Sequence, residues 1–423
     1  MKKVLFIIQS FPSNRSANVL CDEKIMKTML QTDNYEVHCL VYRFHGQPLY
    51  EELNGFKIHR FKRSKWWDLY TFARDNEDKW KYKMIVKINR LFMRLKQLIF
   101  IPLYPNYEPL LAKIAARQAI KLHSKENFDL VVAEHNGRDT LYAGMCLKKK
   151  DPNIKLVSIL WDPISGKRYA KYLPQSYAEK MLLKDEVKLL SQSDRIVCLA
   201  ANQDYQESHS KNKPFYKNIR YLDIPGIISP NFVKGKDEYT VPGMINILYS
   251  GILSVPDRDP SKLIEILNAS KYASNINLMF FSCGLAGVEK AKRSLKNFKG
   301  KYLIHPYVTK CVLDNIAANS DILLNIGGPN ARMVPSKIFE YMALGKPILS
   351  TYYIDNESSC TYFKNYPSAI CLDIRRPTEE CAKDLDRFIE TSKELKIDFL
   401  TVKKLFPLNT PEVYIDLFNE ILN

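Results

Sequence analysis

The chain has 423 residues, of which 46% are hydrophobic and 26% are charged, so its composition excludes a largely disordered protein. This length exceeds one typical hydrophobic core and predicts two domains of about 200 residues each. The nine cysteines are scattered and include no CxxC pair, so we expect a reducing compartment and neither a disulfide framework nor a zinc site.

The net charge of +17 is unevenly distributed along the chain. Residues 57–125 contain 17 Lys and Arg against five acids, which is a net charge of +12. We therefore expect a negatively charged partner at this part of the surface.

The amino-terminal sequence MKKVLFIIQSF contains a five-residue apolar run, which is too short for a signal peptide. No apolar run approaches the roughly 18 residues of a membrane-spanning helix. We therefore expect a cytoplasmic protein, or one bound peripherally at the inner face of the cell membrane.

Short apolar runs predict buried parallel strands in the first half of the chain. They cover residues 4–8, 35–41, 56–61, 128–133, 156–160 and, as the last strand of this domain, 196–199. His135 and Asp162 each follow one of these strands, where open parallel sheets bind ligands, so both are candidates for a cleft. A structural histidine and a turn-forming aspartate before Pro163 are the alternatives.

The stretch from residue 80 to residue 101 has a two-sided helical periodicity. Cations form one stripe, namely Lys83, Lys87, Arg90 and Arg94, and apolar residues form the next, namely Met84, Ile88, Leu91, Leu95 and Leu98. One interpretation is an interfacial helix on an acidic membrane, and the other is a domain helix with a solvated basic face. No recognised motif supports nucleic acid as the partner.

Six prolines and glycines between residues 225 and 243 indicate a linker, taken as residues 229–243. The two domains are then residues 1–228 and 244–407. In the second domain, a strand over residues 245–249 ends at Gly251, and two further strands, over residues 278–281 and 302–304, precede Gly284 and Tyr307. Tyr307 is a candidate for stacking on a nucleotide base, with simple packing as the alternative.

Residues 321–350 indicate a strand, a glycine loop, a helix and a second strand. Gly327 and Gly328 let the backbone turn sharply where a ligand could approach it. Pro335 and Ser336 then mark the start of the helix.

The start of this helix favours an anion because its first N–H groups are unpaired. A diphosphate is the expected guest, with Lys337 in the first turn as its countercharge. Glu340, about one turn further on, is a candidate acceptor for ribose hydroxyls.

The sequence PSKIFEYMALGKP, residues 335–347, resembles the donor-site signature of the family-four retaining glycosyltransferases, which have the GT-B fold. The resemblance implies an α/β protein with two Rossmann-like, doubly wound parallel-sheet domains facing across a cleft. It also implies that a C-terminal helix, residues 408–423, packs back on the first domain. The second glutamate of the family pattern matches Glu340, whereas the place of the first falls on Arg332.

The same resemblance implies further site residues. The family's glycine loop after the first strand is replaced by polar residues that are candidates for acceptor binding, namely Ser13, Asn14, Arg15 and Asn18. His135 matches a cleft histidine near the reacting sugar. Arg258 falls within one residue of a lysine that binds the donor phosphates, and Lys262 is a weaker alternative.

The resemblance therefore implies a metal-independent glycosyltransferase of the hexosyltransferase type, which transfers a sugar from a nucleotide-diphosphate sugar with retention and without a cofactor. His135, Arg258 and Lys337 are the expected catalytic residues. The expected acceptor is a lipid-linked glycan in surface polysaccharide biosynthesis, of capsule or lipopolysaccharide. Asp257 and Asp259 spell a metal-binding DxD, which the order of strand, glycine and helix around them makes us discount.

Two other classes of function stay open. A GT-B fold also serves nucleotide-sugar epimerases, and a non-catalytic module would bind the nucleotide sugar without turning it over. Arg332 is either a solvent-exposed loop residue or, in a donor pocket, a partner for the carboxylate of a uronate.

Overall fold

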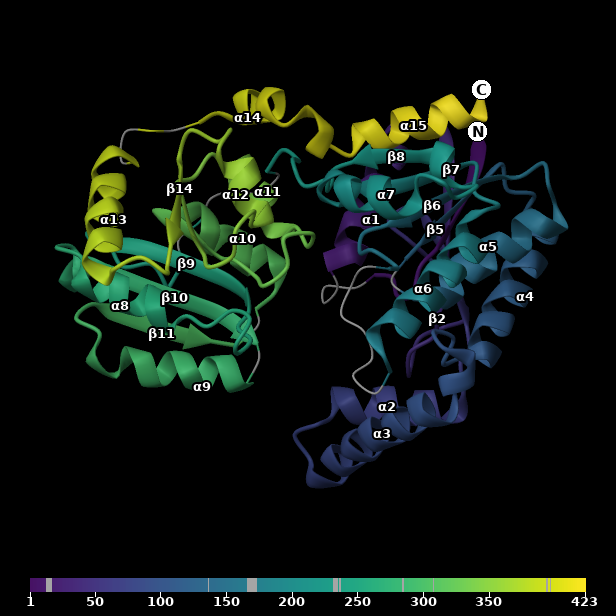
Figure 1. The fold of residues 1–423 in the computed structure, drawn as a ribbon, viewed down its shortest axis with the longest axis horizontal. Coiled ribbons are helices and arrows are strands. Elements are labelled where there is room, and N and C mark those ends of the chain that lie inside the picture. The colour runs from purple at the N-terminus through teal and green to yellow at the C-terminus, as the bar shows by residue number, and fades with distance from the viewer. Residues whose placement is uncertain are drawn as a thin grey trace. The chain divides into compact units, whose positions relative to one another are not determined.

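The protein is described from a computed structural model, which covers residues 1–12, 17–135, 137–165, 173–230, 235, 237–283, 285–306, 308–392, 395 and 397–423. The chain forms two compact units (Figure 1). The first comprises Met1–Asp223 and Glu412–Asn423, and the second comprises Ile224–Pro411. The expected linker, residues 229–243, falls within the second unit.

The first unit is built on an eight-stranded sheet in the order β3-β4-β2-β1-β5-β6-β7-β8. Its strands are β1 (Lys2–Ile7), β2 (Tyr35–Tyr42), β3 (Tyr50–Leu53), β4 (Phe56–Phe61), β5 (Leu130–Glu134), β6 (Lys155–Leu160), β7 (Arg195–Leu199) and β8 (Ile219–Leu222). Neighbouring strands are parallel except for β3, which pairs antiparallel with β4. The prediction that β7 is the last strand of this domain is wrong, because β8 pairs with β7. The four residues of β8 are the buried Ile219, the exposed Arg220 and the half-buried Tyr221 and Leu222, so they lack the continuous apolar run that indicates a central strand.

Helices cover both faces of this sheet, and their bounds are α1 (Ala17–Gln31), α2 (Lys65–Asp75), α3 (Trp80–Ile99), α4 (Pro109–Glu126), α5 (Arg138–Lys150), α6 (Gln175–Leu190), α7 (Gln203–Ser210) and α15 (Glu412–Leu422). The α4 and α5 helices pack together, and α5 lies on β5 and β6. Gly144 permits this contact, because a Cβ there would lie 2.9 Å from the Cβ of Ala133. On the other face, α1 contacts β2 and α15.

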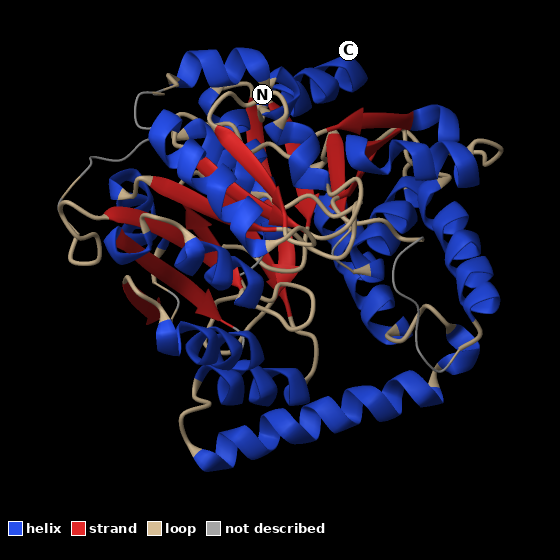
Figure 2. Cartoon of the chain, turned by 60° about the vertical axis from the view of Figure 1, so that its left-hand side comes forward, coloured by secondary structure: helices blue, strands red, loops and turns tan. Residues whose placement is uncertain are grey.

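The second unit is built on a six-stranded parallel sheet in the order β11-β10-β9-β12-β13-β14. Its strands are β9 (Ile245–Ile252), β10 (Ile276–Cys283), β11 (Lys301–His305), β12 (Ile322–Ile326), β13 (Ile348–Tyr352) and β14 (Ala369–Asp373). Its helices are α8 (Ser261–Ala269), α9 (Leu285–Ser294), α10 (Lys310–Asn319), α11 (Lys337–Ala343), α12 (Ser358–Phe363), α13 (Thr378–Ser392) and α14 (Phe399–Leu405). Figure 2 shows the strands of both sheets flanked by helices, which is the α/β class that the sequence predicts.

Each sheet reverses its strand order at one point. In the first unit the chain winds from β1 to β2 and β4 on one side, and then continues from β5 on the other side. In the second unit it winds from β9 to β11, and then continues from β12 on the opposite side of β9. Both sheets are therefore doubly wound, as predicted. In such sheets the crevice for a ligand lies beyond the carboxyl ends of the two strands that flank the reversal.

Candidate functional site

The glycine loop of the second unit begins directly after β12, at the reversal of the strand order. The N–H of Gly327 donates to the carbonyl of Thr351 over 2.8 Å. A Cβ on Gly327 would lie 2.7 Å from that carbonyl oxygen and 3.2 Å from Cγ of Glu357, so a side chain has no space there. Around Gly328 no atom lies within 4 Å of such a Cβ. This part of the loop backbone is open to a ligand.

The short helix α11 follows the loop, and it begins at Lys337 as predicted. Ser336 precedes it with helical dihedral angles and no side-chain cap, so it is not the capping residue that its type suggests. Ile338, Phe339 and Met342 are buried. The hydroxyl of Tyr341 lies 2.9 Å from Oγ of Ser250, which ties α11 to β9.

Lys337 and Glu340 are both half-buried on α11, and Glu340 is held by a cation from a neighbouring helix. Nζ of Lys310 lies 3.6 Å from Oε2 of Glu340 and 2.8 Å from Oδ1 of Asp314. Burial lowers the pKa of Lys310, but these two carboxylates raise it more, so the net shift is upward. Sequence reasoning missed Lys310, although its place just after the end of β11 is a signal that could have found it.

The loop after β9 places Arg258 beyond the end of that strand. Its guanidinium forms no hydrogen bond or ion pair with any other residue that the structure describes, and it is half-exposed. Lys262 is engaged elsewhere, because its Nζ donates to Oγ1 of Thr378 over 2.6 Å. Of the two expected phosphate ligands, Arg258 is therefore the one with an available cation. Gly251 is the second-last residue of β9, and a Cβ there would lie 3.2 Å from the hydroxyl of Tyr249.

Of the two DxD carboxylates that flank Arg258, that of Asp259 is already engaged by neighbouring groups. Oδ1 of Asp259 accepts from the N–H of Ser261 over 2.9 Å and from its hydroxyl over 2.6 Å. The same side chain lies 3.7 Å from Nζ of Lys290. Asp259 thus serves the start of α8, while the backbone carbonyl of Asp257 accepts from Tyr353.

The first unit has its own candidate residues at the reversal between β1 and β5. His135 follows β5 directly and is buried, and its N–H donates to the carbonyl of Ile159 over 2.7 Å. Asp162 follows β6 and is half-buried, and Asn18 is half-buried in the first turn of α1. The structure thus brings the ends of β5 and β6 side by side, as their parallel pairing requires.

Two buried acids next to His135 were missed by sequence reasoning. Glu134 is fully buried, and burial together with the neighbouring Asp22 raises its pKa well above the usual range. Burial also raises the pKa of Asp22 to about 8, although Trp161 donates to it over 2.9 Å. Neither oxygen of Glu134 has a hydrogen-bond partner of good geometry in the described part of the chain, although the nearby side chain of Asn18 lowers its pKa and so offsets a part of the rise. An acid at the end of an apolar strand, just before His135, was the available signal.

Five expected site residues, Ser13, Asn14, Arg15, Gly284 and Tyr307, lie outside the described residues.

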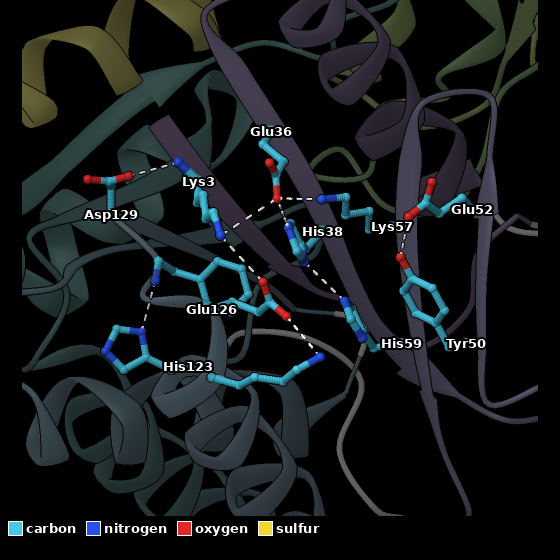
Figure 3. Close-up of polar contacts among 12 residues, drawn as sticks. Lys3, Glu36, His38, Tyr50, Glu52, Lys57, His59, His123, Glu126 and Asp129 are labelled. Atoms are coloured by element: carbon cyan, nitrogen blue, oxygen red, sulfur yellow. Dashed lines mark hydrogen bonds and ion pairs between the residues drawn. The ribbon is translucent and has the colours of Figure 1, made fainter. Parts of the chain in front are cut away.

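A polar cluster with potential metal ligands lies at the side of the first sheet where its parallel strands begin, which we call the amino edge (Figure 3). The side where the parallel strands of a sheet end is called its carboxyl edge. One ligand atom each from Glu36, His38 and Glu126 lies within 4.8 Å of the others. However, Nζ of Lys57 lies 2.8 Å from Oε1 of Glu36, and Nζ of Lys3 lies 3.4 Å from Oε2 of Glu126. These ammonium groups already neutralise the carboxylates, so the cluster does not fit a divalent cation.

Comparisons with known proteins identify the fold. No family model and no curated protein matches the sequence. The α,α-trehalose-phosphate synthase (UDP-forming) of Burkholderia xenovorans, solved in complex with glucose-6-phosphate, matches with a TM-score of 0.65 at 10% identity, over 100% of both chains. The sucrose-phosphate synthase of Thermosynechococcus elongatus matches with a TM-score of 0.62 at 11% identity, over 99% of this chain and 100% of the other. Anabaena HepE in complex with UDP and glucose matches with a TM-score of 0.56 at 13% identity, over the same shares.

These solved structures define the class of fold to which the chain belongs. The alignments cover at least 99% of this chain and 100% of each of these structures. The protein has the GT-B fold, as predicted. At 10 to 13% identity, the likeness identifies the fold alone.

Proposed function

We propose that the protein is a retaining glycosyltransferase that transfers a sugar from a nucleotide-diphosphate sugar to a glycan acceptor. One observation carries this proposal: the open glycine loop, Lys337, Glu340 and the available Arg258 all belong to the carboxyl edge of the second sheet, around its reversal. Neighbours of the same fold are solved with UDP-glucose and with UDP-2-fluoro glucose, which supports a sugar nucleotide as the donor.

In this proposal the two cations carry the catalysis of the second unit. Arg258 and Lys337 bind the diphosphate and stabilise the negative charge that develops on it as the bond to the sugar breaks. This electrostatic role requires no metal ion. Glu340 accepts hydrogen bonds from the ribose hydroxyls, and Lys310 keeps its carboxylate in place.

The first unit is proposed to bind the acceptor through residues after β1, β5 and β6. His135 and Asp162 are the described side chains for this role, and Asn18 lies at the start of α1. We propose a lipid-linked glycan as the acceptor, because the basic segment of residues 57–125 suits an acidic surface. The corresponding process is assembly of a surface polysaccharide.

A panel of nucleotide sugars tests the donor site. The purified protein is incubated with each donor in EDTA, and slow hydrolysis and thermal stabilisation are recorded. We expect one donor to be hydrolysed and to stabilise the protein, and Glu340→Ala and Lys337→Ala to abolish both effects. The matched controls are Glu289→Ala and Lys292→Ala, which change the same residue types at exposed positions of α9. Activity that needs added Mn²⁺ and is lost in Asp257→Asn or Asp259→Asn would contradict the metal-free proposal.

Two neighbouring glycines provide a second test of the same site. Gly327→Ala places a methyl group against the Thr351 carbonyl and should shift the loop, whereas Gly328→Ala adds a methyl group in open space. We expect Gly327→Ala to weaken the affinity for the donor, determined from thermal stabilisation at increasing donor concentration, at least tenfold more than Gly328→Ala. Equal effects of the two changes would show that the loop does not shape the donor site.

A further inference from the structure

The long helix α3 has three distinct sides. Successive residues of an α-helix are about 100° apart, and on this basis α3 divides into a packed side, an apolar side and a cationic side. The packed side consists of the residues that are not exposed, namely Tyr82, Ile85, Val86, Asn89, Met93, Lys96 and Gln97. The apolar side consists of Trp80, Met84, Ile88, Leu91, Phe92, Leu95, Leu98 and Ile99, with Lys81 at its border, and the cationic side of Lys83, Lys87, Arg90 and Arg94.

The packed side holds α3 against α2, and Figure 1 shows the two helices side by side. Nε1 of Trp66 donates to Oδ1 of Asn89 over 2.8 Å, and the rings of Phe72 and Tyr82 lie 5.3 Å apart. Nζ of Lys96 donates to Glu108 over 2.6 Å, which ties the end of α3 to the start of α4. The helix is therefore anchored to the first unit, and the direction of its other sides is determined.

The apolar side of α3 is left in solvent. The side chains of Met84, Ile88, Leu91, Leu95 and Leu98 are between 48% and 59% exposed, and Trp80 is 75% exposed. A domain helix buries its apolar stripe against the core and leaves its charges in water. In α3 the apolar stripe and the cations are both exposed, so the first interpretation of this stretch, an interfacial helix, is the one that the exposures favour.

The cationic side determines which partner suits this apolar stripe. The sequence of α3 contains six Lys and Arg and no acid. None of the four residues on the cationic side forms an ion pair with another residue within the described ranges. A second copy of the chain would bring another row of like charges to the same place, and nucleic acid would leave the apolar stripe in water. An anionic lipid surface satisfies both sides at once.

We infer that α3 docks the protein on the surface of an anionic phospholipid bilayer. The helix lies parallel to the surface, with its apolar side among the acyl chains and its cations at the level of the phosphates. Among the described helices, none is long and apolar enough to cross a membrane. The docking rests on α3 alone and holds whatever reaction the protein catalyses.

Vesicle flotation of the full chain tests this inference. We expect binding to vesicles of phosphatidylcholine with 30% phosphatidylglycerol, and at least tenfold weaker binding to pure phosphatidylcholine. Leu91→Glu with Leu95→Glu should reduce the binding at least tenfold. The matched control is Leu400→Glu with Leu408→Glu, because both of these leucines are also exposed and lie in the second unit. Circular dichroism establishes that each variant is folded.

Two further measurements separate the apolar contribution from the ionic one. Arg90→Gln with Arg94→Gln should weaken binding several-fold and reduce its salt dependence. Tryptophan fluorescence should shift to shorter wavelength on binding, and Trp80→Phe should remove most of this shift. Equal recovery of the protein in the bottom, unbound fraction with both kinds of vesicle would overturn the inference. A dimer in light scattering that dissociates when Leu91 and Leu95 are changed would also overturn it. The same holds for binding to duplex DNA that these changes leave intact, if vesicle binding is absent.

Discussion

At the amino-terminal edge of the first sheet, Glu36, His38 and Lys57 satisfy one another (Figure 3), whereas at the carboxyl edge Asp22 and Glu134 are buried with unpaired oxygens. The pKa values move in opposite directions. Hydrogen bonds from Lys57 and His38 lower the pKa of Glu36 to about 2, while burial raises the pKa of Asp22 to about 8. The amino edge uses its polar groups for stability.

The carboxyl edge keeps acids that burial disfavours as carboxylates. An unpaired buried carboxyl group lowers the stability of the fold. Such groups are therefore expected where the function of the protein requires them. The reversal of the strand order lies at this edge, beside His135. The contrast teaches that in the first sheet the unsatisfied acids lie on the side where a ligand is expected, and the satisfied ones on the opposite side.

The largest expected effect is on the carboxyl edge of the second sheet. Arg258→Ala removes a cation that is proposed to bind the leaving diphosphate, so kcat should fall about 100-fold, as for other electrostatic catalytic groups. The midpoint of thermal unfolding should not change, because the guanidinium has no partner among the described side chains. Steady-state kinetics and a thermal melt check both statements. If Arg258→Ala lowered the stability and left kcat unchanged, Arg258 would be a structural residue and not a catalytic one.

The amino edge should show the opposite response, a loss of stability without a direct loss of chemistry. Glu36→Ala leaves Lys57 and His38 without their shared carboxylate, and we expect a cost of about 2 to 3 kcal/mol. Urea unfolding measures this cost. Glu52→Ala is the control, because this exposed glutamate bonds only to Tyr50 on the edge strand. If both changes cost the same, the network of Glu36 does not stabilise the sheet.

Asp22→Asn should stabilise the protein above neutral pH. The folded-state pKa of about 8 exceeds the usual value of 3.8, so the folded form holds its proton while the unfolded chain loses it. Asp22 therefore reduces stability as pH rises from about 4 to 8, and its isosteric replacement should recover on the order of 2 kcal/mol at pH 8. Trp161 can still donate to the amide oxygen. Unfolding midpoints at pH 5 and pH 8 test this, and an equal effect at both would contradict it.

The smallest expected effect comes from the histidine pair at the amino edge. Nδ1 of His38 lies 3.0 Å from Nε2 of His59, and burial, together with the nearby His38, lowers the pKa of His59 to about 4. The unfolded chain takes up this proton first, so stability is lost as pH falls from about 6.5 to 4. His59→Gln should reduce that loss by about 1 kcal/mol. His209→Gln, on the exposed side of α7, is the control and should leave the pH profile unchanged.

The sequence predicted most of the fold because buried parallel strands have continuous apolar runs. The runs that precede His135, Asp162 and Gly251 each form a central strand. The edge strands β3 and β8 were not predicted, because exposed polar residues interrupt both and leave no such run. Strand order was also beyond the sequence pattern, since pairing joins segments that are far apart in the chain.

In the candidate site, too, the local sequence pattern predicted some features, and others depend on tertiary contacts. The residue types in 335–347 indicate a helix that starts with Lys337 and carries Glu340, and both lie where that pattern places them. The ion pair of Lys310 with Glu340 and the engagement of Lys262 by Thr378 depend on which helices become neighbours. Local periodicity contains no information about these contacts.

For α3, the sequence determined that apolar and cationic residues would occupy separate stripes, because helical spacing alone sets their directions. The tertiary structure decided which side packs: α2 covers the side of Val86 and Asn89 and leaves Leu91 and Leu95 exposed. The same division holds for the acids at the carboxyl edge. Asp22 and Glu134 are ordinary acids in the sequence. The pKa of each is raised because folding removes it from water, and the pKa of Glu134 is raised further by the neighbouring Asp22.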